Sequence, residues 1–101
     1  MDKKISIEHV RGKLKNGVDE KSVMPVLDSM HELIEKQPGF ISREIFKGEG
    51  RLIGVVDHWN SLDEAKQAER LVYESPVSAQ LFSLLEPDSM RVDFLAVIKR
   101  Y

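Results

Sequence analysis

The sequence predicts an α+β domain in which helices cover one face of a four-stranded antiparallel sheet. Three observations lead to this prediction. The expected elements follow the order strand, helix, strand, and then the same order again. No linker or low-complexity stretch divides the 101 residues, a length close to the commonest domain size, so we expect one domain over residues 1–101. Two expected strands are apolar at consecutive positions, which is typical of a sheet covered on both faces.

The first strand and the first helix are expected between residue 5 and residue 36. Residues 5–14 alternate loosely between apolar and polar side chains, starting with two isoleucines, and therefore indicate a strand. Ser22 can cap a helix whose apolar residues follow the period of 3.6, and Pro25 falls in its first turn, where proline is tolerated. The apolar positions of this helix are Val23, Val26, Leu27, Met30, Leu33 and Ile34.

A hairpin is expected in the middle of the chain. The turn residues Pro38-Gly39 end the first helix, and residues 40–46 then have the composition of a strand. Two glycines lie in the stretch 47–50, which is typical of a tight connection between antiparallel strands. Residues 52–59 are therefore expected to pair with the strand before them.

The second helical segment has clear start and stop signals. Ser61 and Glu64 form a capping box, in which the serine side chain accepts a hydrogen bond from the backbone N–H of Glu64. Ser75 and Pro76 interrupt the segment and start it again, because serine caps a helix and proline suits its first position. Pro87 ends it, and a final strand is expected over residues 90–99.

This order of elements is the split βαβ pattern of a ferredoxin-like fold. In residues 52–56 and 94–98 consecutive side chains are apolar, so both faces of the sheet favour burial. The helices cover one face only. Since an exposed apolar sheet face favours association, we expect a second copy of the chain to cover it, giving a homodimeric α/β barrel with a ligand cavity at the gap between the two sheets.

Composition and charge exclude several classes of protein. The net charge of −2 and the scattered basic residues, including the terminal pairs Lys3-Lys4 and Lys99-Arg100, do not indicate a nucleic-acid partner. The absence of cysteine excludes disulfides and thiolate ligands, and the three histidines lack the spacing of a zinc site. No glycine-rich phosphate loop, signal peptide or membrane span is expected. We therefore expect a cytoplasmic protein that binds no membrane, metal or cofactor.

Three stretches resemble the antibiotic biosynthesis monooxygenase (ABM) domain family of dimeric α/β-barrel proteins. They are residues 37–42 (QPGFIS), residues 58–65 (HWNSLDEA) and residues 74–77 (ESPV), and together with the element order the resemblance covers nearly the whole chain. It implies a homodimer with a cavity in each protomer between sheet and helices. Members of the family include cofactor-independent oxygenases that convert polycyclic aromatic phenols to quinones, and haem-degrading enzymes.

The family's functional residues carry over only in part. The tryptophan of the phenol oxygenases matches Trp59. Their strand asparagine, four residues earlier, falls on Val55, and their helix tyrosine, six residues later, falls on Ala65. The chain therefore resembles the family while its cavity residues differ.

Haem degradation is not expected. The asparagine that the haem degraders carry on the first strand falls on Val10, or on His9 with a one-residue gap. Their helix tryptophan and histidine fall within residues 67–80, where neither residue type occurs.

Two candidate catalytic residues stand out. Strand alternation places Asp57 on the face of Val55 and Trp59, where burial raises the pKa of a carboxyl group and makes it a candidate base. The alternative is an ion-paired Asp57 at the end of a strand, beside a Trp59 that only fills the core. His9, on the first strand, is a candidate proton shuttle, and the alternative is a hydrogen-bonded or edge-exposed imidazole.

Four residues are candidates for substrate binding. Trp59 offers an aromatic wall and Val55 an apolar one, Tyr73 can hydrogen-bond a ligand at the cavity mouth, and Arg43 can pair with an anion. Ordinary surface contacts are the alternative for Tyr73 and Arg43. We therefore expect a monooxygenase-like oxidoreductase that acts without a cofactor on a small or planar phenol. A non-catalytic module that binds a small molecule or a protein is the alternative, because the residues leave open whether a reaction is catalysed.

Overall fold

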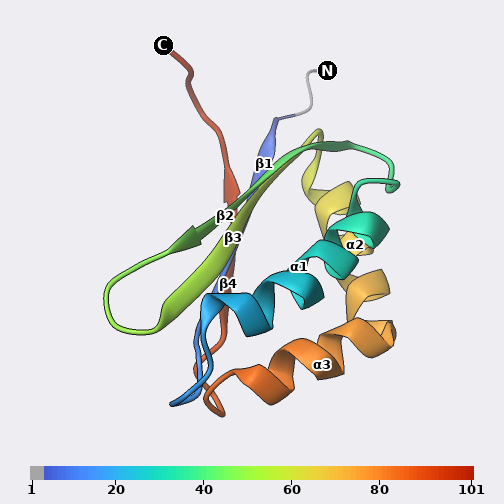
Figure 1. Cartoon of the computed structure of the whole chain (residues 1–101). Helices are drawn as coiled ribbons and strands as arrows, with labels where there is room; N and C mark the ends of the chain where they lie inside the picture. Colours follow the sequence, from blue (N-terminus) through green and yellow to red (C-terminus); the bar gives the residue numbers. More distant parts are fainter. Residues whose placement is uncertain (1–3) are drawn as a thin grey trace.

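The structure, a computed structural model, describes residues 4–101; Met1, Asp2 and Lys3 lie outside the described residues, and with them the expectation of a solvated Lys3. The elements are β1 (Ser6–Lys13), α1 (Glu20–Ile34), β2 (Phe40–Lys47), β3 (Leu52–Trp59), α2 (Leu62–Glu74), α3 (Pro76–Leu84) and β4 (Arg91–Ala96). Figure 1 shows the helices gathered on one side of the sheet. Within residues 4–101 no helix is long and apolar enough to cross a bilayer.

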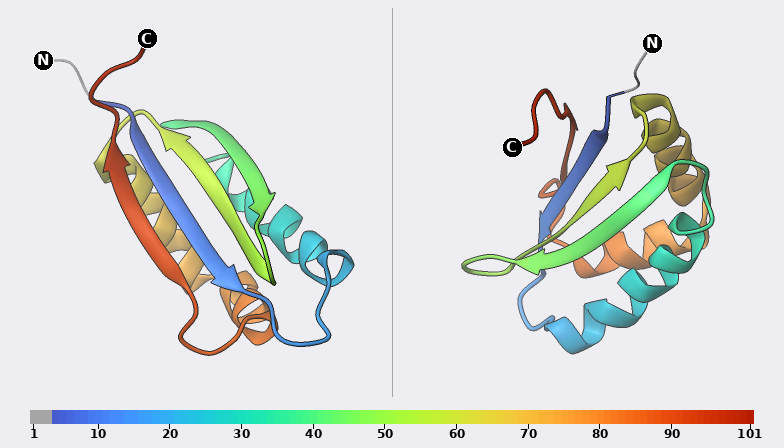
Figure 2. Two further views of the ribbon diagram at one scale, coloured as in Figure 1. Left: turned by 90° about the vertical axis from the view of Figure 1, so that its left-hand side faces the viewer. Right: turned by 90° about the horizontal axis from the view of Figure 1, so that it is seen from above.

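The sheet confirms the ferredoxin-like prediction. In the described residues its strand order is β2-β3-β1-β4, and every neighbouring pair is antiparallel. The left view of Figure 2 looks onto the face of this sheet that the helices leave open. The apolar core lies between the other face and the helices, where Val23, Val55 and Leu81 are among its buried residues.

Helix α1 begins earlier than the sequence predicts. Asp19, not Ser22, is its N-cap: the Asp19 carboxylate accepts hydrogen bonds from the backbone N–H and the hydroxyl of Ser22, at 3.1 and 3.2 Å. Aspartate caps a helix as well as serine does, so the helix can begin three residues earlier, with exposed residues in the added turn. Pro25 therefore lies inside the helix rather than in its first turn.

The edge strands also differ in length from the prediction. Strand β3 spans the predicted residues, whereas β4 ends at Ala96 rather than at residue 99. Ala96 pairs with Ser6, the first residue of β1, so β4 ends where its partner begins. Beyond this end, the backbone N–H of Val97 donates one further hydrogen bond to the carbonyl oxygen of Ile5, with an N–O distance of 2.9 Å.

Two of the stretches that resemble the ABM family form one structural corner. Gly39 has a φ of +85°, which a residue with a side chain rarely adopts, and a Cβ there would lie 2.4 Å from the Glu64 carboxyl carbon. The Ser61 hydroxyl accepts from the backbone N–H of Glu64 at 3.2 Å and donates to the Glu64 carboxylate at 2.8 Å. The carboxylate of the cap thus fills the space that the glycine leaves free.

This cap predicts a stability effect that is independent of function. Ser61→Ala removes both hydrogen bonds and should lower the free energy of unfolding by about 1 kcal/mol. Urea unfolding of the variant measures the loss. Ser29→Ala, an exposed change within α1, is the matched control and should change the midpoint little. An unchanged midpoint for Ser61→Ala would show that the cap does not stabilise α2.

Candidate functional site

A cavity of about 70 Å³ lies between the sheet and the helices. Val10, Val55 and Leu81 are among its apolar walls, which come from β1, β3 and α3. Tyr73 and Phe82 also line it and are 44% and 40% exposed, with ring centroids 6.0 Å apart, so these two rings stand where the cavity meets solvent. The cavity is on the side of the sheet that the resemblance to the ABM family implied.

Five charged residues line this apolar cavity, and one of them, Arg11, is ion-paired with Asp93. We call the other four the polar cluster: Glu8, Arg43, Asp57 and Glu69. Three of them lie in one row across the sheet, because Asp57 on β3 is directly opposite Glu8 on one side and Arg43 on the other. Glu69 reaches the cavity from α2, above the sheet. The register of the sheet therefore concentrates charge at one place in the core.

A β-bulge brings Arg43 into this row. The register of β2 against β3 shifts between Phe40, which pairs with Trp59, and Ser42, which pairs with His58. Without the extra residue, Ser42 would stand opposite Asp57 and Arg43 would point to the open face of the sheet. The bulge leaves Ile41 45% exposed and directs the Arg43 side chain into the core.

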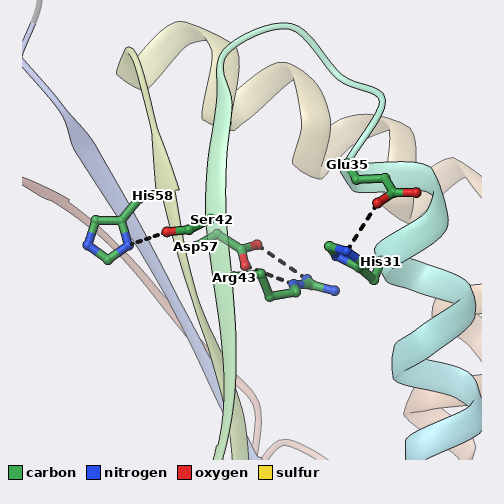
Figure 3. A network of polar contacts seen from close by, with 6 residues as sticks. All are labelled: His31, Glu35, Ser42, Arg43, Asp57 and His58. Carbon is green, nitrogen blue, oxygen red and sulfur yellow. Dashed lines mark hydrogen bonds and ion pairs between the residues drawn. The ribbon is translucent and has the colours of Figure 1, made fainter.

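Arg43 and Asp57 form a buried, two-point ion pair. Arg43 Nε donates to Asp57 Oδ1 at 2.8 Å and Nη2 donates to Oδ2 at 3.2 Å, while the side chains are only 4% and 1% exposed. Figure 3 shows this pair on the helix side of the sheet, with Ser42 and His58 on the other side. Burial raises the pKa of Asp57, and the guanidinium opposes that rise by stabilising the charged form.

Glu8 is the most strongly perturbed acid of the cavity. Burial, a hydrogen bond with Glu69 and the negative charges of Asp57 and Glu69 raise its pKa to about 8. The same cause, burial, together with the charges of Glu69 and Glu8, raises the pKa of Tyr73 above its ordinary value. Glu8 therefore carries its proton at neutral pH, in hydrogen-bond contact with a second carboxyl group.

The polar cluster keeps hydrogen-bonding capacity that the protein does not use. Arg43 Nη1 is buried and has no hydrogen-bond partner among residues 4–101, and Glu69 Oε2 is buried with no partner there other than the Glu8 carboxyl group. One is a donor and the other an acceptor, and both residues line the cavity. Buried polar atoms are nearly always paired, so these two atoms indicate that water or another polar molecule completes their hydrogen bonds in the cavity.

Four of the residues predicted from sequence come together here. Asp57, Val55, Arg43 and Tyr73 all line the cavity. The prediction left open whether Asp57 is a base or an ion-paired residue, and it is paired, with Arg43. The alternative for Arg43, an ordinary surface contact, is wrong, because the side chain is buried.

His9 does not join them. It lies on the open face of the sheet, opposite Val56, where its ring packs 5.4 Å from the ring of Phe46 and its Nδ1 is 3.5 Å from Arg11 Nη1. Strand alternation explains the placement, because its neighbours Glu8 and Val10 point into the cavity. The position of His9 therefore gives no support to a proton shuttle in this cavity.

Trp59 is part of the core beside the cavity rather than one of the residues that line it. Its side chain is fully buried, and the Phe40 ring packs edge-on against it with centroids 5.5 Å apart. This is the core-filling alternative. Its Nε1 has no hydrogen-bond partner among the described residues.

Sequence reasoning missed Glu8 and Glu69. The two isoleucines near the start of β1 suggested that Glu8 points outward, whereas Glu8 shares its face with Val10 and the buried Gly12. Glu69 lies within the stripe of α2 that includes Ala65 and Ala68, both buried. The signal that could have found them is an acidic residue at a position whose neighbours on the same face are apolar.

Solved structures share this fold. SnoaB, a cofactor-independent oxygenase from Streptomyces nogalater, superposes as an asparagine-to-alanine mutant with a TM-score of 0.80 over 96% of both chains, at 12% sequence identity. A candidate antibiotic biosynthesis monooxygenase from Nitrosomonas europaea gives 0.78 over 97% of this chain and 94% of its own, at 9% identity. The chain has the fold of the ABM family.

A dimeric ferredoxin-like protein from an uncultured marine organism also shares the fold, with a TM-score of 0.70 at 13% identity over 99% of this chain and 93% of its own. The sequence matches no family model and no curated protein. The likeness is therefore one of fold, and the residues that line the cavity have to carry any argument about function. Within residues 4–101 no group of three or more His, Cys, Asp or Glu side chains could hold a metal ion.

The raised pKa of Glu8 predicts a specific dependence of stability on pH. An unfolded glutamate ionises near pH 4.5, whereas folded Glu8 keeps its proton up to about pH 8. The contribution of Glu8 to the free energy of unfolding therefore falls as the pH rises from about 4.5 to about 8. Above pH 8 the loss stays constant. Glu8→Gln should remove this loss and be more stable than the wild type by at least about 1 kcal/mol at pH 8, with little difference at pH 4.

Urea unfolding at pH 4, 6 and 8 measures this difference. Glu49→Gln, an exposed change in the β2-β3 turn, is the control and should follow the wild type at each pH. A constant difference between Glu8→Gln and the wild type across this range would contradict the assignment.

Proposed function

We propose that this protein belongs to the ABM family and is a cofactor-independent oxygenase that converts a small phenol to a quinone. The observation that carries the proposal is the Glu8-Glu69 pair, a buried acid-base pair in the wall of an apolar cavity. The fold supports it, because SnoaB, which shares the fold, is a cofactor-independent oxygenase.

The carboxyl pair supplies a base of suitable strength. An ordinary carboxylate is about six pKa units too weak to deprotonate a phenol, whose pKa is about 10. Above about pH 8, where Glu8 has lost its own proton, its carboxylate narrows that gap to about two units, and Glu69 provides a neighbouring oxygen that shares the proton taken up. Such a pair titrates as a unit, so the proton taken from the substrate belongs to both groups.

The proposed reaction needs no external reductant. The phenol O–H bond breaks and its proton moves to the carboxyl pair, and the resulting phenolate transfers one electron to dioxygen. The phenoxyl radical and superoxide combine at a ring carbon and take up the proton, giving a hydroperoxide. Cleavage of the O–O bond with loss of the ring hydrogen releases water and leaves the quinone, so one phenol and one dioxygen give one quinone and one water.

Asp57 has a positioning role in this proposal. Both of its oxygens are engaged by Arg43, so it is not free to accept a proton from the substrate. Its charge instead raises the pKa of Glu8 and its two hydrogen bonds hold Arg43 at the cavity wall. The sequence suggested Asp57 as the base. We propose instead that Glu8, directly opposite Asp57 in the sheet, has this role.

Oxygen uptake with a panel of one-ring and two-ring phenols tests this function. At about pH 9, where Glu8 is ionised, we expect uptake with the wild type and a loss of at least tenfold in kcat for Glu8→Gln, because an amide cannot accept the proton. Glu49→Gln, the control in the exposed turn, should retain wild-type activity. If phenols bind without any oxygen uptake, the protein is a non-catalytic binding module and the proposal is wrong.

We also propose a homodimer formed through the open face of the sheet. On this face Ile7 and Val56 are half-buried and Leu95 is 49% exposed in the single chain. Two of its charged side chains pair with each other, since Arg11 Nη1 donates to Asp93 Oδ2 at 2.8 Å. A second copy can bury the exposed apolar part of this face, which favours association.

Light scattering at micromolar concentration should therefore give twice the mass of the chain. Leu95→Glu places a charge in the proposed interface and should raise the dimer dissociation constant at least tenfold. Leu71→Glu, at a similarly exposed leucine on α2, is the control and should leave the dimer intact. A wild-type protein that stays monomeric under these conditions would overturn the assembly.

A further inference from the structure

We propose that the cavity takes a neutral one-ring aromatic compound that carries both a hydroxyl group and a carbonyl group. The carbonyl oxygen accepts a hydrogen bond from Arg43 Nη1, and the hydroxyl donates to Glu69 Oε2. This inference rests on the proposed function and names the class of its substrate. Four features of the site lead to it: a fixed donor, an opposing acceptor, the balance of charge and the size of the cavity.

The donor is Arg43. Its side chain is 4% exposed, and Asp57 fixes the guanidinium at two points, so the plane of the group and the direction of the remaining N–H bonds are set before a ligand arrives. Nη1 is buried without a partner among residues 4–101. Guanidinium nitrogens donate and do not accept, so the group that completes this site offers an oxygen with a free lone pair.

The acceptor is Glu69, which comes from α2 rather than from the sheet. Its Oε2 is buried, and no group of residues 4–101 other than the protonated Glu8 carboxyl, which is hydrogen-bonded to Glu69, donates to it. A carboxylate has two oxygens with several lone pairs, so Glu69 can accept a further hydrogen bond. A carboxylate oxygen needs a donor, and a hydroxyl group supplies one. Because Arg43 and Glu69 reach the same cavity from the two layers of the fold, a single molecule can satisfy both.

The balance of charge excludes an anionic ligand. The polar cluster holds three carboxyl groups and one guanidinium, and two of the guanidinium nitrogens already serve Asp57. Arg11, the second basic residue that lines the cavity, is already paired with Asp93. A carboxylate or phosphate would therefore bring a further negative charge into a low-dielectric site without an unpaired cation to balance it. A neutral carbonyl makes the same hydrogen bond to Arg43 without that cost.

The size of the cavity sets the limit of one ring. A protein cavity of about 150 Å³ is known to bind benzene, and the cavity here is about 70 Å³. One aromatic ring therefore requires the exposed rings of Tyr73 and Phe82 to move at the mouth, and a polycyclic compound would require the core to open. The cavity favours a smaller substrate than polycyclic phenols.

This substrate class suits the proposed chemistry. When the hydroxyl loses its proton to the Glu8-Glu69 pair, conjugation spreads the negative charge through the ring to the carbonyl oxygen. That oxygen lies against Arg43 Nη1, whose hydrogen bond becomes stronger as the charge develops. The carbonyl also lowers the pKa of the hydroxyl and so reduces the remaining gap to the pKa of Glu8.

The test is equilibrium binding by calorimetry, in the absence of oxygen and at pH 6. The three hydroxyacetophenones, with the hydroxyl at the 2, 3 or 4 position, carry both groups at different separations. Acetophenone lacks the hydroxyl, and the ethylphenols lack the carbonyl at nearly the same shape. The best hydroxyacetophenone should bind at least about tenfold more tightly than acetophenone and than the matching ethylphenol, because each analogue leaves one buried group unpaired.

Two variants assign the two contacts. Glu69→Gln should reduce the preference for hydroxyacetophenone over acetophenone. Arg43→Lys, which keeps a charge beside Asp57, should reduce the preference over ethylphenol. Thermal unfolding shows whether each variant folds, and the comparison of ligands on the wild-type protein stands without them.

Affinities within threefold across all three ligand classes would overturn the proposal and would show that water alone serves the two polar atoms. Tighter binding of hydroxybenzoate than of hydroxyacetophenone would also overturn it, by making the site an anion site. Because binding is measured without oxygen, a protein that binds as expected and consumes no oxygen contradicts the proposed oxygenase function and not the ligand class.

Discussion

The pairing of Asp57 with Glu8 on one side and Arg43 on the other is the constraint on which the rest of this structure depends. Three charged residues in one row of a sheet are costly to bury, and the cost is reduced only because Arg43 meets Asp57 at two points. The Glu8 carboxyl has no such partner and keeps its proton instead. Substituting apolar residues would relieve this cost, so stability does not explain the cluster, and this agrees with the functional role that we propose for it.

Three features of the fold bring the side chains of the polar cluster together. The bulge in β2 turns Arg43 inward, the antiparallel register aligns the acids of β1 and β3, and α2 brings Glu69 over the sheet. The core around these groups is apolar, so their charges are weakly screened and shift the pKa values of Glu8 and Asp57. The corner of Gly39, Ser61 and Glu64 holds the start of α2 and so helps to fix the helix that carries Glu69.

The sequence was sufficient for the fold and for part of the site. Turn glycines, the Ser61 cap and the break at Ser75 act locally, so they can be recognised one segment at a time. The faces of β3 were also predictable, because its alternation is regular. The face of Glu8 and the inward direction of Arg43 were not, since one depends on which of two apolar sets β1 buries and the other on a single inserted residue in β2.

The proton on Glu8 is the most direct measure of whether this cavity is an acid-base site. Carbon-13 NMR of protein labelled at the glutamate side-chain carboxyl groups follows the ionisation of each group, and the Glu8→Gln variant assigns the signal. We expect the Glu8 signal to titrate with a midpoint near pH 8. A midpoint near the ordinary value of 4.5 would show that the carboxyl group is solvated or otherwise neutralised, and would contradict the account.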